Sequence, residues 1–163
     1  MTSKIKDLAL NAIIAALYVV VTLLTSFMSY GGIQFRIAEI LVLLCFYDKK
    51  YNKALILGCI VSNLFSPFGI YDVIFGTLAT FLSIICMNRI KKISIASLCP
   101  VIFNGIIIAI EICIFDNIIN LQEFLILALG IMFGEFVVVS LVGVPVFKVL
   151  ERQEKFQKAL NVK

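Results

Sequence analysis

The chain has 163 residues, of which 62% are hydrophobic and 15% are charged, and its mean hydropathy is +1.10. Soluble domains are about 45–50% apolar, so this composition excludes an ordinary soluble domain and predicts an integral membrane protein. The formal net charge is +4. Because the basic residues border apolar stretches, we expect contact with anionic membrane lipid and not with nucleic acid.

A membrane-spanning helix needs about 20 apolar residues, and six stretches of the chain are candidates. In chain order they are 8–28, 34–47, 52–66, 71–88, 94–115 and 121–150. The second and third are short enough to form one re-entrant hairpin, but that arrangement would leave the basic residues between them outside. The sixth is longer than a membrane requires, and we expect a kink at Gly143 and Pro145.

Basic residues give these segments an orientation. Thirteen of the fourteen Lys and Arg residues fall in four clusters: Lys4 and Lys6; Lys49, Lys50 and Lys53; Arg89, Lys91 and Lys92; and Lys148, Arg152, Lys155, Lys158 and Lys163. Cytoplasmic loops are enriched in Lys and Arg, so the pattern predicts an even number of crossings. We therefore predict one domain, residues 1–163: an all-α bundle of six transmembrane helices in the cell membrane, with both termini cytoplasmic.

Nothing in the sequence points to catalysis. There is no His, and we find no nucleophile–base pair, Gly-rich phosphate loop or metal-ligand spacing. The five Cys residues lie singly within apolar runs, where we expect buried small apolar side chains. The sequence therefore predicts no catalytic residue, no cofactor and no metal.

Polar side chains within the predicted helices are informative, because ionisable groups are costly in a bilayer and commonly mark a site. Eight of them fall in the outer half or near the middle of the predicted bundle, whereas the inner half is nearly free of them. These candidate substrate-binding residues are Gln34, Arg36, Glu39, Asn63, Asp72, Asn104, Glu111 and Glu135. A channel would need polar groups along its whole length, so the pattern predicts a cup that opens outward above a dry floor.

Some of these residues have a simpler interpretation. Arg36 and Glu39 are spaced i,i+3 and could pair only with each other. Asp72 could be only the N-cap of its helix, and Asn104 could be a hydrogen-bonding link between helices.

Glu111 and Glu135 are harder to explain structurally, since no Lys or Arg lies at their depth in the same helices. Each must be protonated, paired with Arg36, or satisfied by a ligand. The Gly31-Gly32 pair is permissive in backbone, and we expect the loop from Ser29 to Phe35 to act as a gate above the cup.

Small residues form a second pattern. Ala12 and Ala16 in the first helix, and Gly130 and Gly134 in the sixth, each form a small-xxx-small pair that permits close helix approach. Internal packing is the simpler explanation, above all for the glycines. For Ala12 and Ala16, binding to a separate protein partner is the alternative.

Two stretches of the sequence resemble the signatures of the QueT family. They are Ile33-Gln34-Phe35-Arg36-Ile37-Ala38-Glu39 and the run from Ser62 to Gly76, SNLFSPFGIYDVIFG; Gly134-Glu135 leading to Gly143 fits as well. The resemblance implies a substrate-binding S-component of an energy-coupling factor (ECF) importer for a queuosine precursor, a deazaguanine base. It also implies docking to a membrane coupling subunit through an alanine motif, here Ala12 and Ala16, and two cytoplasmic ATPase subunits.

The residues are chemically compatible with such a ligand. A guanine-like base presents ring N–H and exocyclic amine donors that a Glu carboxylate can accept as a pair, while Asn or Gln can meet its carbonyl edge. A cationic aminomethyl group would call for a second carboxylate. The alternatives are an S-component for another vitamin-like solute, and a membrane enzyme or scaffold in which the carboxylates only stabilise packing.

Overall fold

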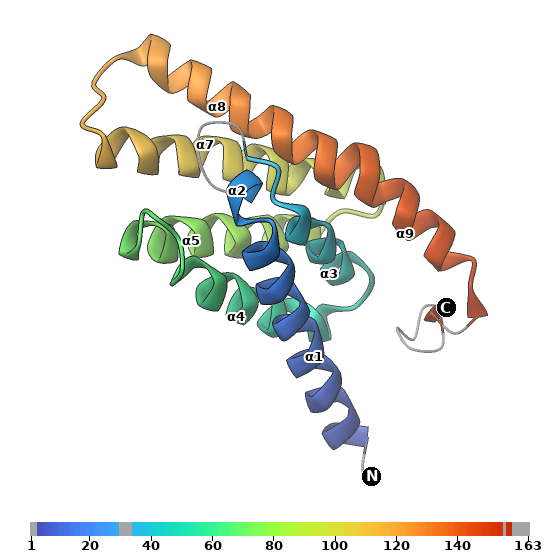
Figure 1. Ribbon diagram of the computed structural model, residues 1–163. Coiled ribbons are helices and arrows are strands. Elements are labelled where there is room, and N and C mark those ends of the chain that lie inside the picture. Colours follow the sequence, from blue (N-terminus) through green and yellow to red (C-terminus); the bar gives the residue numbers. More distant parts are fainter. Residues whose placement is uncertain (1–2, 30–33, 155, 158–163) are drawn as a thin grey trace.

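The computed structural model describes residues 3–29, 34–154 and 156–157, and every regular element in this part of the chain is helical (Figure 1). In chain order the elements are α1 (Ser3–Leu24), α2 (Ser26–Ser29), the 3-10 helix η1 (Ile37–Leu43), α3 (Leu44–Tyr47), the 3-10 turn η2 (Lys49–Tyr51), α4 (Asn52–Asn63), α5 (Ile70–Met87), α6 (Ile93–Ala96), α7 (Leu98–Phe115), α8 (Leu121–Glu135), the π-helix η3 (Phe136–Gly143) and α9 (Val144–Glu151).

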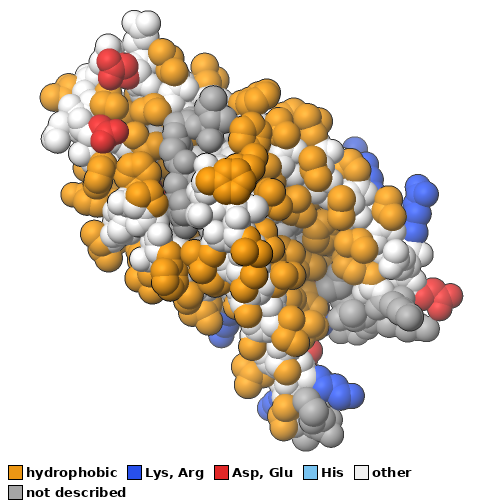
Figure 2. All heavy atoms as spheres, in the orientation of Figure 1, with side chains coloured by type: hydrophobic (Ala, Val, Ile, Leu, Met, Phe, Trp, Pro, Cys, Tyr) orange, Lys and Arg blue, Asp and Glu red, His pale blue; other side chains and the backbone are white. Residues whose placement is uncertain are grey.

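Four helical stretches in the described residues are long and apolar enough to cross a membrane: Lys4–Leu24, Ile70–Met87, Ile93–Phe115 and Leu121–Glu151. Ile37–Tyr47 is a shorter apolar helix, and α4 has 12 residues. Large apolar side chains cover much of the visible outer surface in Figure 2, as suits helices that face lipid. An all-helical membrane protein is confirmed, whereas a full crossing by the two shorter segments stays a prediction.

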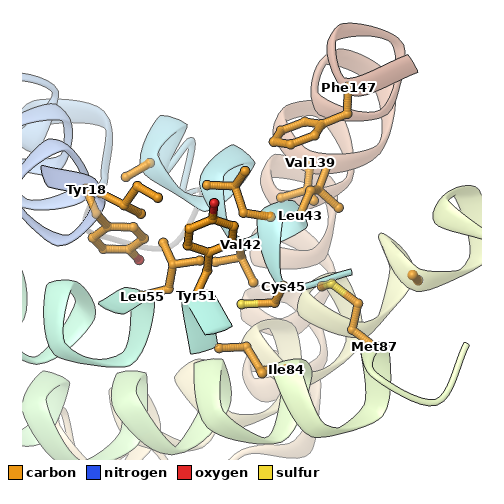
Figure 3. Packing of buried hydrophobic residues seen from close by; sticks show 14 of the residues in the cluster. Tyr18, Val42, Leu43, Cys45, Tyr51, Leu55, Ile84, Met87, Val139 and Phe147 are labelled. Carbon is orange, nitrogen blue, oxygen red and sulfur yellow. The ribbon is translucent and has the colours of Figure 1, made fainter. Parts of the chain in front are cut away.

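Consecutive long helices pack on one another, α1 on α4, α4 on α5, α5 on α7 and α7 on α8, while η1 lies between α1 and η3. Tyr18, Val42 and Leu55 contribute to a continuous buried apolar cluster (Figure 3). Gly58 allows α4 to approach α1, because a Cβ at this position would lie 3.0 Å from Cβ of Tyr18. The outward-opening cup with a dry floor stays a prediction.

The ends of the bundle differ in charge. The start of α1 and the end of α9 lie on one side, opposite the turns that join α4 to α5 and α7 to α8 (Figure 1). In Figure 2 the visible Lys and Arg side chains lie toward the side that holds these two helix ends, and none is visible at the α7–α8 turn, where carboxylates are seen. The visible basic side chains therefore lie toward one end of the bundle, and the cytoplasmic orientation of that end stays a prediction.

One local prediction was wrong. Residues 34–36 are not helical, and the second helix begins at Ile37 with 3-10 geometry. The sixth helix runs from α8 through η3 into α9, with the π-helical segment ending at Gly143 and Pro145 in the first turn of α9. The kink expected at Gly143 and Pro145 stays a prediction.

Candidate substrate-binding site

All eight predicted site residues are buried, although they come from distant parts of the sequence. Each exposes 4% or less of its surface: Gln34, Arg36, Glu39, Asn63, Asp72, Asn104, Glu111 and Glu135. The chain contributes them from the segment before η1, from η1 itself, and from α4, α5, α7 and α8. Buried ionisable groups in a membrane bundle mark a functional site by default, and here they form one cluster.

Arg36 lies at the centre of this cluster. Its guanidinium interacts electrostatically with Asp72 and Glu39, and also with Glu111 and Glu135. Gly76 on α5 leaves room for the neighbouring Asn63, since a Cβ at Gly76 would lie 2.5 Å from Nδ2 of Asn63. Arg36 and Glu39 are therefore not an isolated i,i+3 pair, because three further carboxyl groups lie within electrostatic range of the same guanidinium.

One part of the cluster is built around Asp72. The Ser66 hydroxyl donates a hydrogen bond to the Asp72 carboxylate, and the Asn63 side-chain amide donates to the Asp72 backbone carbonyl at 2.8 Å. Asp72 is not the N-cap of its helix, because Gly69 takes that position and Asp72 lies within the first turn of α5. The Glu111 carboxyl, from α7, lies beside the Asp72 carboxyl and interacts with it electrostatically.

The other part is built around Glu39 and Glu135. The Tyr18 hydroxyl on α1 donates a 2.5 Å hydrogen bond to Oε1 of Glu39. The Asn104 amide on α7 donates a 2.9 Å hydrogen bond to Oε1 of Glu135, so Asn104 does link two helices. The two carboxyl groups also interact with each other, which places Asn104 and Tyr18 as neutral donors beside two acids.

Gln34 reaches the cluster through a close backbone contact. A Cβ at Gly134 would lie 2.1 Å from the backbone oxygen of Gln34, so only glycine fits where α8 meets this segment. The Phe35 N–H donates a 2.8 Å hydrogen bond to the Met28 carbonyl. The ends of the predicted gate are thereby joined, while residues 30–33 of that gate lie outside the described residues.

The cluster leaves several buried acceptors unsatisfied. Six buried side-chain oxygens of the cluster have no hydrogen-bond partner among the described residues: Oε2 of Glu39, Oδ1 of Asn63, Oδ1 of Asp72, both carboxyl oxygens of Glu111, and Oε2 of Glu135. Leaving a buried acceptor unpaired costs about 1–3 kcal/mol, and more for a charged group. A molecule rich in N–H donors would satisfy them.

Sequence reasoning missed Tyr18, Ser66 and Gly76. Tyr18 is fully buried, and a buried tyrosine hydroxyl usually finds a partner, so a tyrosine within an apolar helix was the available signal. Ser66 carried no comparable signal, because serine is common in turns.

Ala12 and Ala16 lie outside this cluster. Both are exposed on α1, whereas Ala15 between them is buried. Ala12 also lines a groove of about 300 Å³ between α1 and α4, together with Leu8, Asn11, Ala15, Lys50, Lys53, Ala54 and Leu57. The two alanines therefore face away from the protein's own core.

The fold and the cluster together define an all-helical membrane protein that holds several ionisable side chains in its interior. The family model described as QueT transporter matches residues 8–152. The chain therefore belongs to the QueT transporter family, a family of transporters and not of enzymes.

A curated relative agrees with this assignment. The chain is 43% identical over 96 residues to the "Queuosine precursor transporter QueT" of Lactococcus lactis subsp. cremoris (strain MG1363), and the match covers 55% of this chain and 56% of the relative. The chain thus spans about half the length of the curated relative it matches. No solved structure matches the chain significantly.

Proposed function

We propose that the protein is the substrate-binding S-component of an ECF importer and that it captures a deazaguanine precursor of queuosine. The observation that carries this proposal is the buried cluster around Arg36, in which six side-chain oxygens have no hydrogen-bond partner among the described residues. The relative's name, a queuosine precursor transporter, supplies the ligand class. The proposed ligand is rich in the N–H donors that these oxygens lack.

Binding would use the polar residues in complementary roles. The free Oε2 of Glu135 and that of Glu39 accept from the ring N–H and exocyclic amine of the base, while the side-chain amide of Gln34 is suited to its carbonyl edge. Tyr18 and Asn104 hold the buried carboxylates of Glu39 and Glu135 in fixed orientations. This lowers the entropic cost of binding the ligand.

The proposal includes six membrane crossings with both termini in the cytoplasm. The gathering of basic side chains on the side that holds the start of α1 and the end of α9 supports this orientation. Uptake then requires an ATP-driven partner, and we assign that role to a coupling subunit with two ATPase subunits. The exposed Ala12 and Ala16 on α1 supply the face on which the coupling subunit docks.

Co-purification tests the assembly. The tagged protein, expressed together with its coupling and ATPase subunits, should retain all three through detergent purification and should take up labelled deazaguanine in an ATP-dependent manner. Specific binding of the base without any association with the coupling module would contradict the transport part of the proposal. Association with the coupling module without binding of the base would contradict the proposed substrate.

A further inference from the structure

The charges in the cluster do not balance. Four buried carboxyl groups, those of Glu39, Asp72, Glu111 and Glu135, interact with Arg36 as their shared guanidinium. One cation can neutralise one carboxylate, and burying a charge without a partner is expensive. The excess acid must therefore be met by protons or by positive charge from a bound molecule.

The four carboxyl groups differ in how well their oxygens are satisfied by hydrogen bonds. Glu39 and Glu135 each accept a hydrogen bond from a neutral donor, Tyr18 and Asn104 respectively. Glu111 is fully buried, and its polar neighbour is the Asp72 carboxyl; neither Glu111 oxygen accepts from an amide, hydroxyl or backbone N–H donor in the described part of the chain. Asp72 beside it accepts from Ser66 through one oxygen, while its Oδ1 has no such partner there.

Three oxygens without a hydrogen-bond donor, on two adjacent carboxyl groups, suit a ligand group that carries several N–H donors. A primary ammonium group has three N–H donors that can point in different directions, and a charge-assisted hydrogen bond is roughly twice as strong as a neutral one. The planar edge of a base, in contrast, presents its donors in one direction and suits a single carboxylate.

We propose that Asp72 and Glu111 form a subsite for a primary ammonium group on the substrate, distinct from the base-binding residues Glu39, Asn104 and Glu135. This inference rests on the proposed function and adds that the protein selects a cationic ligand over a neutral one. In this arrangement α5 and α7 supply the charge recognition, and η1, α7 and α8 supply the base recognition.

A matched pair of ligands tests the subsite. Binding to the purified protein is measured by calorimetry for 7-aminomethyl-7-deazaguanine, which is cationic, and for its 7-hydroxymethyl analogue, which is neutral and of similar size. The parent protein should bind the cation at least about tenfold more tightly, as expected for one charge-assisted hydrogen bond. Glu111→Gln should remove most of this preference by weakening binding of the cation alone.

Glu135→Gln is the control, since it should weaken binding of both ligands to a similar degree. Glu111→Gln is preferred to Asp72→Asn because Asp72 also binds Ser66, so that its replacement could disturb the fold. Equal binding of the two ligands by the parent protein would overturn the subsite but leave the proposed function standing. Equal loss of both ligands in Glu111→Gln would also overturn it, whereas binding of neither ligand by the parent would refute the proposed function itself.

Discussion

Asn104 on α7 donates its side-chain amide to Oε1 of Glu135 at the end of α8, at a distance of 2.9 Å, in the buried middle of the bundle. The hydrogen bond fixes one oxygen of the carboxylate and leaves Oε2 without a hydrogen-bond partner among the described residues. Glu135 is also the last residue before the π-helix η3, and such segments occur frequently at functional sites. We infer that Glu135 is held in place for a ligand.

Replacing this carboxylate should impair binding. Glu135→Gln should weaken ligand binding about 10- to 100-fold, because it removes a charge-assisted hydrogen bond worth about 1.5–3 kcal/mol. Calorimetric titration of the purified variant measures the change. Glu123→Gln, at an exposed position in the first turn of the same helix, should bind as the parent does, and unchanged binding in Glu135→Gln would show that this carboxylate is structural.

The hydroxyl of Tyr18 should stabilise the folded protein. Tyr18→Phe removes the donor to the buried Oε1 of Glu39, and leaving such an acceptor unpaired costs about 1–3 kcal/mol. We expect a lower melting temperature in detergent for this variant. Tyr71→Phe is the control, because Tyr71 is partly exposed. Equal melting temperatures for Tyr18→Phe and the parent protein would argue against a structural role for this hydrogen bond.

Gly134 should tolerate no side chain. In Gly134→Ala the added Cβ would meet the Gln34 backbone oxygen, and the resulting displacement of the segment that carries Arg36 should weaken ligand binding. Overpacking of this kind costs about 1–3 kcal/mol, against a gain in helix propensity of about 1 kcal/mol.

Gly143→Ala is the matched control for this variant. A Cβ at Gly143 would lie 3.0 Å from Cδ1 of Leu43, the end of a flexible side chain that can move. We expect near-normal binding in this control, and the prediction for Gly134 fails if the two alanine variants bind the ligand equally well.

The exposed alanines of α1 should matter for transport and not for binding. Ala12→Trp or Ala16→Trp should abolish uptake and association with the coupling subunit, because a bulky side chain holds helices apart. Both residues are exposed, so ligand binding by the isolated protein should persist. Leu129→Trp, on the exposed surface of α8, should leave uptake intact, and loss of ligand binding in the alanine variants would indicate that the alanines pack internally.

Much of the site could be predicted from the sequence, since a Glu or Arg within an apolar segment is conspicuous wherever the helix ends fall. Glu111 and Glu135 could be placed in the bundle interior because an ionisable side chain seldom faces lipid. The partners could not be predicted, because the hydrogen bond from Tyr18 to Glu39 depends on how α1 packs against η1.

Local helix geometry was harder to predict from the sequence. Apolar spacing does not distinguish a 3-10 from an α-helix over the seven residues of η1, and residues 34–36 lie outside the helix. Similarly, nothing in the local sequence indicated the π-helical turns of η3, through which the helix continues into α9. Contacts with neighbouring helices decide such details, and these contacts are not visible in the local sequence.

The central claim is that the buried cluster around Arg36 binds a deazaguanine base. Mass spectrometry of small molecules released from the purified protein tests it most directly, with the protein isolated from cells supplied with the base and compared with a double variant, Glu111→Gln with Glu135→Gln. The account predicts a stoichiometric deazaguanine in the parent protein and its loss from the folded double variant. A different solute in the parent, or equal retention of the base by the variant, would contradict it.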